Sequence, residues 1–132
     1  MKRYLAFALA LVCLVTLAGC AAGHISFNIS GAGRIELCSG EDGTAVEISD
    51  AGNIKYITDN INALKFSKGE SSKDYGGWSY RLRWYDAGDK LIEEIVVMSE
   101  YLIDYDGHFC SGMEADHEID TDFLDALLEN AE

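Results

Sequence analysis

The sequence predicts an α+β domain in which a mainly antiparallel β-sheet, made of hairpins and a meander, carries one mid-chain helix and one C-terminal helix packed on one face. Short segments that alternate apolar and polar residues flank turn-like sequences, which indicates hairpins. Two further segments repeat apolar residues at helical spacing. Helices do not alternate regularly with strands, which disfavours a parallel topology, and the expected order is β-β-β-α-β-β-β-β-β-α.

The first part of the domain predicts three short strands, at residues 25–29, 34–38 and 44–48. Each alternates apolar and polar side chains, as a half-buried strand does. Gly31-Ala32-Gly33 separates the first two strands, and a second turn at residues 39–43 separates the second from the third. We expect these three strands to form a meander.

A helix is expected next, over residues 51–64. Asp50 precedes it and can accept a hydrogen bond from a free backbone N–H of the first turn. Four apolar residues at helical spacing define one buried stripe. They are Ile54, Ile57, Ile61 and Leu64. Residues 69–77, which are polar and contain glycine and serine, are expected to form a loop.

The clearest hairpin covers residues 78–98. Its turn is Asp86-Ala87-Gly88-Asp89, where Gly88 is free to adopt a positive φ. Side chains alternate between the two faces of a strand. The first strand therefore places Trp78, Tyr80, Leu82 and Trp84 on one face, toward the core, and Ser79, Arg81, Arg83 and Tyr85 on the other. Glu93 and Glu94 on the returning strand lie within cross-strand reach of the two arginines, with the register open by one residue.

The C-terminal part predicts a second hairpin and a helix. Its strands are residues 101–105 and 108–110, joined by the turn Asp106-Gly107. The helix covers residues 121–130, with Asp120 as its N-cap. The apolar side of this helix consists of Phe123, Leu124, Leu127 and Leu128.

Residues 1–19 have the features of an export signal. Lys2 and Arg3 precede an apolar run over residues 4–18, which is shorter than the roughly 20 residues of a membrane-spanning helix. The tetrapeptide Leu17-Ala18-Gly19-Cys20 then resembles the lipobox of bacterial lipoproteins.

The lipobox resemblance implies that Cys20 receives a diacylglycerol and that the chain is cleaved before it. Two acyl chains give a stable membrane anchor, whereas one chain gives marginal binding. We therefore expect a lipid-anchored protein on the extracytoplasmic face of the cell membrane. Residues 1–19 are then the leader, residues 20–24 a short tether and residues 25–132 a single domain.

The mature chain is strongly acidic. Loss of Lys2 and Arg3 with the leader changes the formal net charge from −13 to −15, and residues 91–132 hold thirteen acidic and no basic side chains. This charge argues against nucleic acid as a partner. The acidic end should be repelled by anionic lipid. It provides either a docking face for a cationic partner or Ca²⁺, or a solvated surface that keeps the protein soluble.

Cys38 and Cys110 are the two cysteines that remain after cleavage and lipidation. Outside the cytoplasm they can form a disulfide. The alternative is that both are free thiols that pack as small apolar side chains. The sequence leaves both possibilities open.

No catalytic or metal motif stands out. The chain contains no GxSxG or SxxK sequence and no glycine-rich phosphate loop, so we expect no catalytic residue and no cofactor other than the lipid on Cys20. His108, Cys110 and His117 do not have the spacing of a zinc site.

Four acidic residues, Asp116, Glu118, Asp120 and Asp122, alternate like an incomplete calcium loop. An EF-hand needs glycine at position six and glutamate at position twelve, where this chain has Thr121 and Leu127. We therefore expect no metal site, and we assign these carboxylates to helix capping and solvation.

The best candidate binding surface consists of Tyr75 and Tyr85 with Arg81 and Arg83, beside the loop at residues 69–77. Aromatic residues are enriched at binding hot spots, and the two arginines could contribute to an anion-binding patch. The alternative is that these charges simply offset neighbouring acidic residues.

From Ile54 onward the chain resembles a group of small cell-surface lipoproteins of Gram-positive bacteria that have no assigned activity. The stretches that carry the resemblance are Ile57-Thr58-Asp59-Asn60-Ile61-Asn62, Gly77-Trp78-Ser79-Tyr80, Trp84-Tyr85-Asp86 and Lys90-Leu91-Ile92. They match elements of the predicted helix, strands and turn. The resemblance implies the fold and the location, and it supplies no catalytic residue.

Three hypotheses for function follow. The first is a non-enzymatic, membrane-anchored binding or interaction module, whose partner is an unknown protein or small molecule. The second is an inhibitor or immunity-type lipoprotein that blocks a secreted hydrolase with its acidic C-terminal face. The third is a small envelope enzyme, which would need a concave site with a perturbed titratable group.

Overall fold

The computed structural model describes residues 24–112 and 117–131. The predicted leader with its lipidation site Cys20, and Asp116 of the calcium-like pattern, lie outside these residues. The elements in chain order are β1 (His24–Ile25), β2 (Arg34–Ser39), β3 (Ala45–Ile48), α2 (Ala51–Ala63), β4 (Phe66–Ser71), β5 (Tyr80–Tyr85), β6 (Leu91–Ser99), β7 (Leu102–Tyr105), β8 (His108–Gly112) and α3 (Thr121–Glu129). This is the predicted order of strands and helices.

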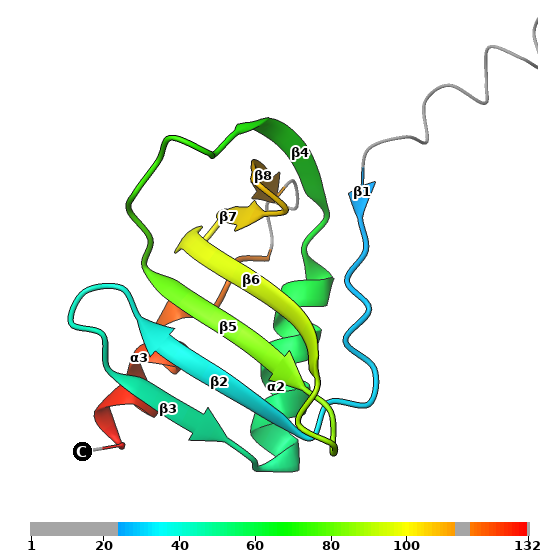
Figure 1. The fold of residues 1–132 in the computed structure, drawn as a ribbon, viewed down its shortest axis with the longest axis vertical. Coiled ribbons are helices and arrows are strands. Elements are labelled where there is room, and N and C mark those ends of the chain that lie inside the picture. The colour runs from blue at the N-terminus through cyan, green and yellow to red at the C-terminus, as the bar shows by residue number, and fades with distance from the viewer. Residues whose placement is uncertain (1–23, 113–116, 132) are drawn as a thin grey trace, which may run out of the picture.

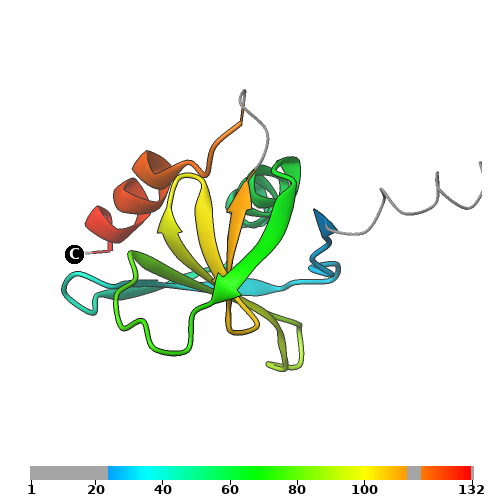
Figure 2. The ribbon, with the colours of Figure 1, turned by 90° about the horizontal axis from the view of Figure 1, so that it is seen from above.

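The strands of the described residues form one antiparallel sheet in the order β1-β4-β8-β7-β6-β5-β2-β3 (Figure 1). Strands β5 to β8 are a meander, and β2 and β3 form a hairpin. Both helices lie on the same side of the sheet (Figure 2). The predicted α+β class, with its antiparallel sheet and two helices on one face, is confirmed.

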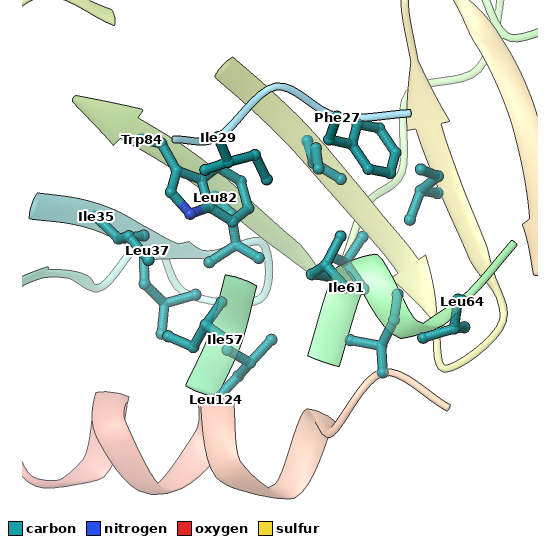
Figure 3. Packing of buried hydrophobic residues seen from close by; sticks show 14 of the residues in the cluster. Phe27, Ile29, Ile35, Leu37, Ile57, Ile61, Leu64, Leu82, Trp84 and Leu124 are labelled. Atoms are coloured by element: carbon teal, nitrogen blue, oxygen red, sulfur yellow. The ribbon is translucent and has the colours of Figure 1, made fainter. Parts of the chain in front are cut away.

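The predicted meander of the three N-terminal strands is wrong. β1 pairs with β4 at one edge of the sheet, whereas β2 and β3 lie at the other edge. Residues 26–29 are not a strand, yet the side chains of Phe27 and Ile29 are buried (Figure 3). The Phe27 ring packs edge-on against Phe66 and Tyr105, with centroid distances of 5.9 and 4.9 Å. The alternation in this segment therefore reflects burial against the core, without sheet pairing.

Strand β4 extends through residues 69–71, which the sequence predicts as loop. It pairs with β8, where Lys68 lies opposite Cys110. A Cβ atom on Gly69 would lie 2.9 Å from the Phe109 carbonyl oxygen, so a side chain there would collide with β8. Most β4 side chains are exposed, which explains the weak apolar alternation. Pairing on both sides, with β1 and β8, makes this polar segment a strand.

The hydrophobic core lies between the sheet and the helices (Figure 3). The helical segments contribute Ile57, Ile61, Leu64, Leu124 and Leu128, all of which the helical periodicity predicts. Trp84 of β5 is fully buried, and its indole N–H donates to Thr58 Oγ1 at 3.1 Å. This bond satisfies the one polar atom that the indole brings into the core.

Both predicted helix caps are present. The Asp50 and Asp120 carboxylates accept hydrogen bonds from the backbone N–H groups of Asn53 and Phe123, at 2.9 and 3.0 Å. Each bond satisfies a donor that the first turn of a helix leaves free. Within the described residues, neither helix has the length and apolar character needed to cross a membrane.

Trp78 departs from its predicted position in the core. It precedes β5, is only half-buried, and stacks against Arg81, whose side chain lies on the opposite face of the strand from Leu82. Alternation within the strand places Tyr80, Leu82 and Trp84 correctly, but it does not extend to a residue two positions before the strand begins.

Candidate interaction surface

One face of the sheet carries no helix within the described residues, and we call it the helix-free face (Figure 2). A row of five residues crosses it, each directly opposite the next on adjacent strands: Cys38 of β2, Arg81 of β5, Val96 of β6, Asp104 of β7 and Phe109 of β8. Residues in register share a face. Because the next row contains the buried Leu82, this row points away from the core.

Arg83 joins three strands on the helix-free face. It lies between Glu36 of β2 and Glu94 of β6, its register partners. Its Nε donates to Glu94 Oε2 at 2.6 Å, and its Nη1 donates to Glu36 Oε1 at 3.2 Å. The hydrogen bond to Glu94 is the main reason that the pKa of Arg83 is raised. Two of the three guanidinium nitrogens of Arg83 are therefore used within the sheet.

Tyr85 supports a second arginine. The Arg34 guanidinium lies 3.8 Å from the Tyr85 ring centroid, and its Nε donates to Asp89 Oδ1 at 2.9 Å. Its Nη1 also lies 3.7 Å from Glu47 Oε2. The hydrogen bond to Asp89 raises the pKa of Arg34. The Tyr85 ring thus stacks against the Arg34 guanidinium, which is ion-paired with Asp89 of the β5–β6 turn.

Arg81 differs from these two arginines. Its guanidinium stacks over Trp78, with 4.4 Å from Cζ to the ring centroid. Its Nε is buried and has no hydrogen-bond partner among the described residues. The residues directly opposite, Cys38 and Val96, carry no charge.

Residues 72–79, which we call the β4–β5 loop, lie on the side of the sheet opposite to the helices (Figure 2). Ser72 is only 4% exposed, and its hydroxyl donates to Asp104 Oδ1 at 2.6 Å. The Tyr75 ring packs edge-on against Phe109, at a centroid distance of 5.3 Å. The loop therefore contacts the row at β7 and β8, and Trp78 contacts it again at β5.

The structure brings together most of the predicted binding surface. Arg81, Arg83 and Tyr85 share the helix-free face, and Tyr75, which is 61% exposed, stands on Phe109 of the same face. Sequence reasoning missed Trp78 as the partner of Arg81. It also missed Arg34, Asp104 and Phe109, because their positions depend on strand register and not on local pattern.

The two cysteines are free in the structure, and a disulfide between them is excluded. Cys38 lies on β2 and Cys110 on β8, with β5, β6 and β7 between them. Four strand spacings of about 4.8 Å place them far beyond the ~7 Å Cα separation that a disulfide tolerates. Cys110 is buried among core residues, and this burial raises the pKa of its thiol. Cys110 therefore fits the second alternative, a buried thiol that packs as a small apolar side chain, whereas Cys38 is only partly buried and lies on the helix-free face.

Tyrosine hydroxyls donate hydrogen bonds to several carboxylates in this acidic chain. Tyr56 donates to Asp120 at 2.6 Å and Tyr101 to Glu118 at 3.0 Å, and each bond raises the pKa of its tyrosine. The Asn60 side chain donates to the Glu118 carbonyl and accepts from the Asp120 N–H, both at 2.9 Å. Two carboxylates of the calcium-like pattern thus connect α3 to the rest of the fold.

A hollow of about 320 Å³ lies between the β2–β3 turn and α3. Its walls include four carboxylates and the apolar Leu128. The acidic residues are Glu41, Asp42, Asp125 and Glu129. Asp42 accepts a hydrogen bond from the Thr44 N–H at 2.9 Å, which lowers its pKa, and Asp125 accepts one from Tyr80 at 2.5 Å.

The other residues considered for metal binding do not converge. His108 Nδ1 lies 3.0 Å from the Asp106 carbonyl oxygen, and His117 is exposed. Among residues 24–112 and 117–131, no three histidine, cysteine, aspartate or glutamate side chains are arranged to hold a metal ion.

The chain matches no family model, no curated protein and no solved structure. What the structure itself defines is an α+β domain with one face of its antiparallel sheet left open, where arginine and aromatic side chains are held in fixed positions.

Proposed function

We propose that this protein is a lipid-anchored, non-enzymatic binding module of the extracytoplasmic membrane face, and that the helix-free face contacts its partner. The observation that carries this proposal is the arginine and aromatic surface around Arg81. It lies on a sheet face that no described helix covers. Arginine, tryptophan and tyrosine are the residue types that dominate the energetics of protein interfaces.

The anchor fits this use of the domain. Cys20 precedes β1 by four residues, which span at most about 14 Å. β1 lies at one edge of the sheet, and β5 is five strands away in the order. The central strands of the helix-free face would therefore stay accessible when the β1 edge is held near the bilayer.

The test is site-specific photo-crosslinking in intact cells. A photoreactive phenylalanine replaces Tyr85 or Tyr75 on the helix-free face, and replaces Lys55 on the exposed side of α2 as the control. We expect a defined adduct from the first two positions and none from Lys55. Equal labelling from all three positions, or from none, would contradict the proposal.

The anchor is tested separately with Cys20→Ser. This variant should be released into the medium or remain unprocessed. If it is fully processed and still fractionates with membranes, the anchor part of the proposal fails.

The acidic hollow favours a second candidate, the inhibitor or immunity-type lipoprotein. A cationic group of a secreted hydrolase would then enter between the β2–β3 turn and α3. Glu41 and Glu129 are both exposed, so Glu41→Gln with Glu129→Gln removes charge at little cost to the fold. Loss of protection against the hydrolase in this double variant supports the candidate, and unchanged protection rejects it.

A further inference from the structure

Arg81 is the arginine that the described part of the protein leaves without an acidic partner. Arg34 and Arg83 each pair with two carboxylates. No described residue forms a hydrogen bond or ion pair with the Arg81 side chain, and its Nε is buried.

The neighbouring carboxylates bind Arg83 and not Arg81. Glu36 and Glu94 are the acidic residues diagonal to Arg81 on β2 and β6, and both accept hydrogen bonds from Arg83. The sheet therefore gives the Arg83 side chain two carboxylate acceptors and gives the Arg81 side chain none.

The orientation of Arg81 is fixed without using its terminal nitrogens. Stacking on Trp78 holds the plane of the guanidinium, and Nε is the only Arg81 nitrogen that is both buried and unpartnered. The terminal pair is thus open to solvent. These nitrogens form a planar fork that matches a carboxylate with two parallel hydrogen bonds. Cys38 and Val96 on either side carry no charge that would compete for these nitrogens.

We infer that Arg81, held on Trp78, binds a side-chain carboxylate of a protein partner that docks on the helix-free face. This inference rests on the proposed function and names the chemistry of its partner. One guanidinium matches one singly charged carboxylate. A polyanion such as nucleic acid or a phosphate-rich polymer is repelled by a mature chain of formal charge −15.

The probe is a blocked pentapeptide with one central glutamate, added to the processed, lipid-anchored protein in nanodiscs. NMR follows the Arg81 Nε–H and the Trp78 indole N–H. We expect both signals to shift, with an affinity at least about tenfold above that of the matched glutamine peptide. A third peptide has the central glutamine and a free C-terminal carboxylate. It tests whether Arg81 binds the carboxylate at the end of a chain in place of a side-chain carboxylate.

Two variants carry the control. Arg81→Gln should abolish the shift at Trp78, whereas Lys90→Gln, which removes the same charge at the β5–β6 turn, should preserve it. The inference is overturned if the glutamine peptide binds equally, if only the free chain end binds, if no peptide binds, or if Arg81→Gln behaves like the native protein.

The same variant separates this inference from the proposed function in cells. If the adduct from Tyr85 persists undiminished in Arg81→Gln, the helix-free face binds a partner but not through this carboxylate pair. If no adduct forms in the native protein, the proposed function itself fails.

Discussion

At the scale of single residues, two arginines on one strand show how register decides the use of a charge. Arg83 lies opposite carboxylates on both sides, whereas Arg81, two residues earlier, lies opposite a cysteine and a valine. The two side chains point to the same face and have similar sequence surroundings. Their partners differ because the strands pair in one register, so substitution should affect them differently.

We expect Arg83→Leu to lower the free energy of unfolding by about 1 kcal/mol, because Glu36 and Glu94 lose the cation between them and solvent screens the partly exposed pair. Arg81→Leu should leave the free energy of unfolding unchanged or raise it, because a buried unsatisfied donor is removed. Urea unfolding of both variants measures the difference. A loss at Arg81 as large as at Arg83 would contradict this account.

Tyr105 gives a pH dependence at the same scale. Burial, and then the hydrogen bond from its hydroxyl to Glu93 at 2.9 Å, raise its pKa from 10.0 to about 12. Because the folded-state pKa is above the unfolded-state pKa, this stabilisation is complete below pH 10 and is lost as the pH rises toward 12.

Stability should therefore fall across that alkaline window, and Tyr105→Phe should reduce the slope. Urea unfolding at a series of pH values, with tyrosinate absorbance as the direct titration, measures both effects. Tyr75→Phe is the control, since it removes an exposed tyrosine. An identical slope in Tyr105→Phe and in the native protein would show that this hydroxyl is not involved.

At the scale of elements, short sequence patterns predicted the helices, whereas pairing between strands distant in the sequence determined the arrangement of the sheet. The caps at Asp50 and Asp120 and the apolar stripes are encoded within a few residues, and both helices form where expected. β4 has few local signals, because its strand character depends on β1 and β8. The predicted surface has the same limit: alternation placed Arg81, Arg83 and Tyr85 together, but only the register reveals their partners.

Close packing between the β2–β3 turn and the start of β5 gives a prediction at this scale. A Cβ atom on Gly40 would lie 2.0 Å from the Trp78 carbonyl oxygen and 2.8 Å from its ring, so Gly40→Ala should displace Trp78. We expect a loss of about 2 kcal/mol in the free energy of unfolding. Gly76→Ala is the matched control, because nothing lies within 4 Å of its Cβ position. Urea unfolding and tryptophan fluorescence should leave Gly76→Ala near the native protein, and equal behaviour of the two variants would refute the predicted clash.

At the scale of the whole molecule, the proposed anchor and the acidic hollow belong to opposite edges of the sheet. β1 and β4 form the edge nearest the tether, and β3, with α3 packed beside it, forms the other (Figure 1). Seven strand spacings of about 4.8 Å separate the edge strands, or roughly 34 Å along the sheet. β4 carries one exposed lysine, Lys68, and one exposed acid, Glu70, so its formal charge is zero, whereas the hollow beside β3 is lined by carboxylates. Anionic lipid should therefore favour β4 as the nearer edge.

This orientation predicts the depth of labels in reconstituted membranes. Lys68 of β4 or Glu47 of β3 is replaced by cysteine and spin-labelled, in a protein that also carries Cys38→Ser and Cys110→Ala. The lipidated protein is then incorporated into vesicles that contain anionic lipid. A nickel-chelating lipid should relax the label at position 68 strongly and the label at position 47 weakly, because the second lies six strands from the first. Stronger relaxation at position 47, or equal relaxation at both positions, would contradict the predicted orientation. If the protein does not remain with the vesicles, the proposed anchor is rejected instead.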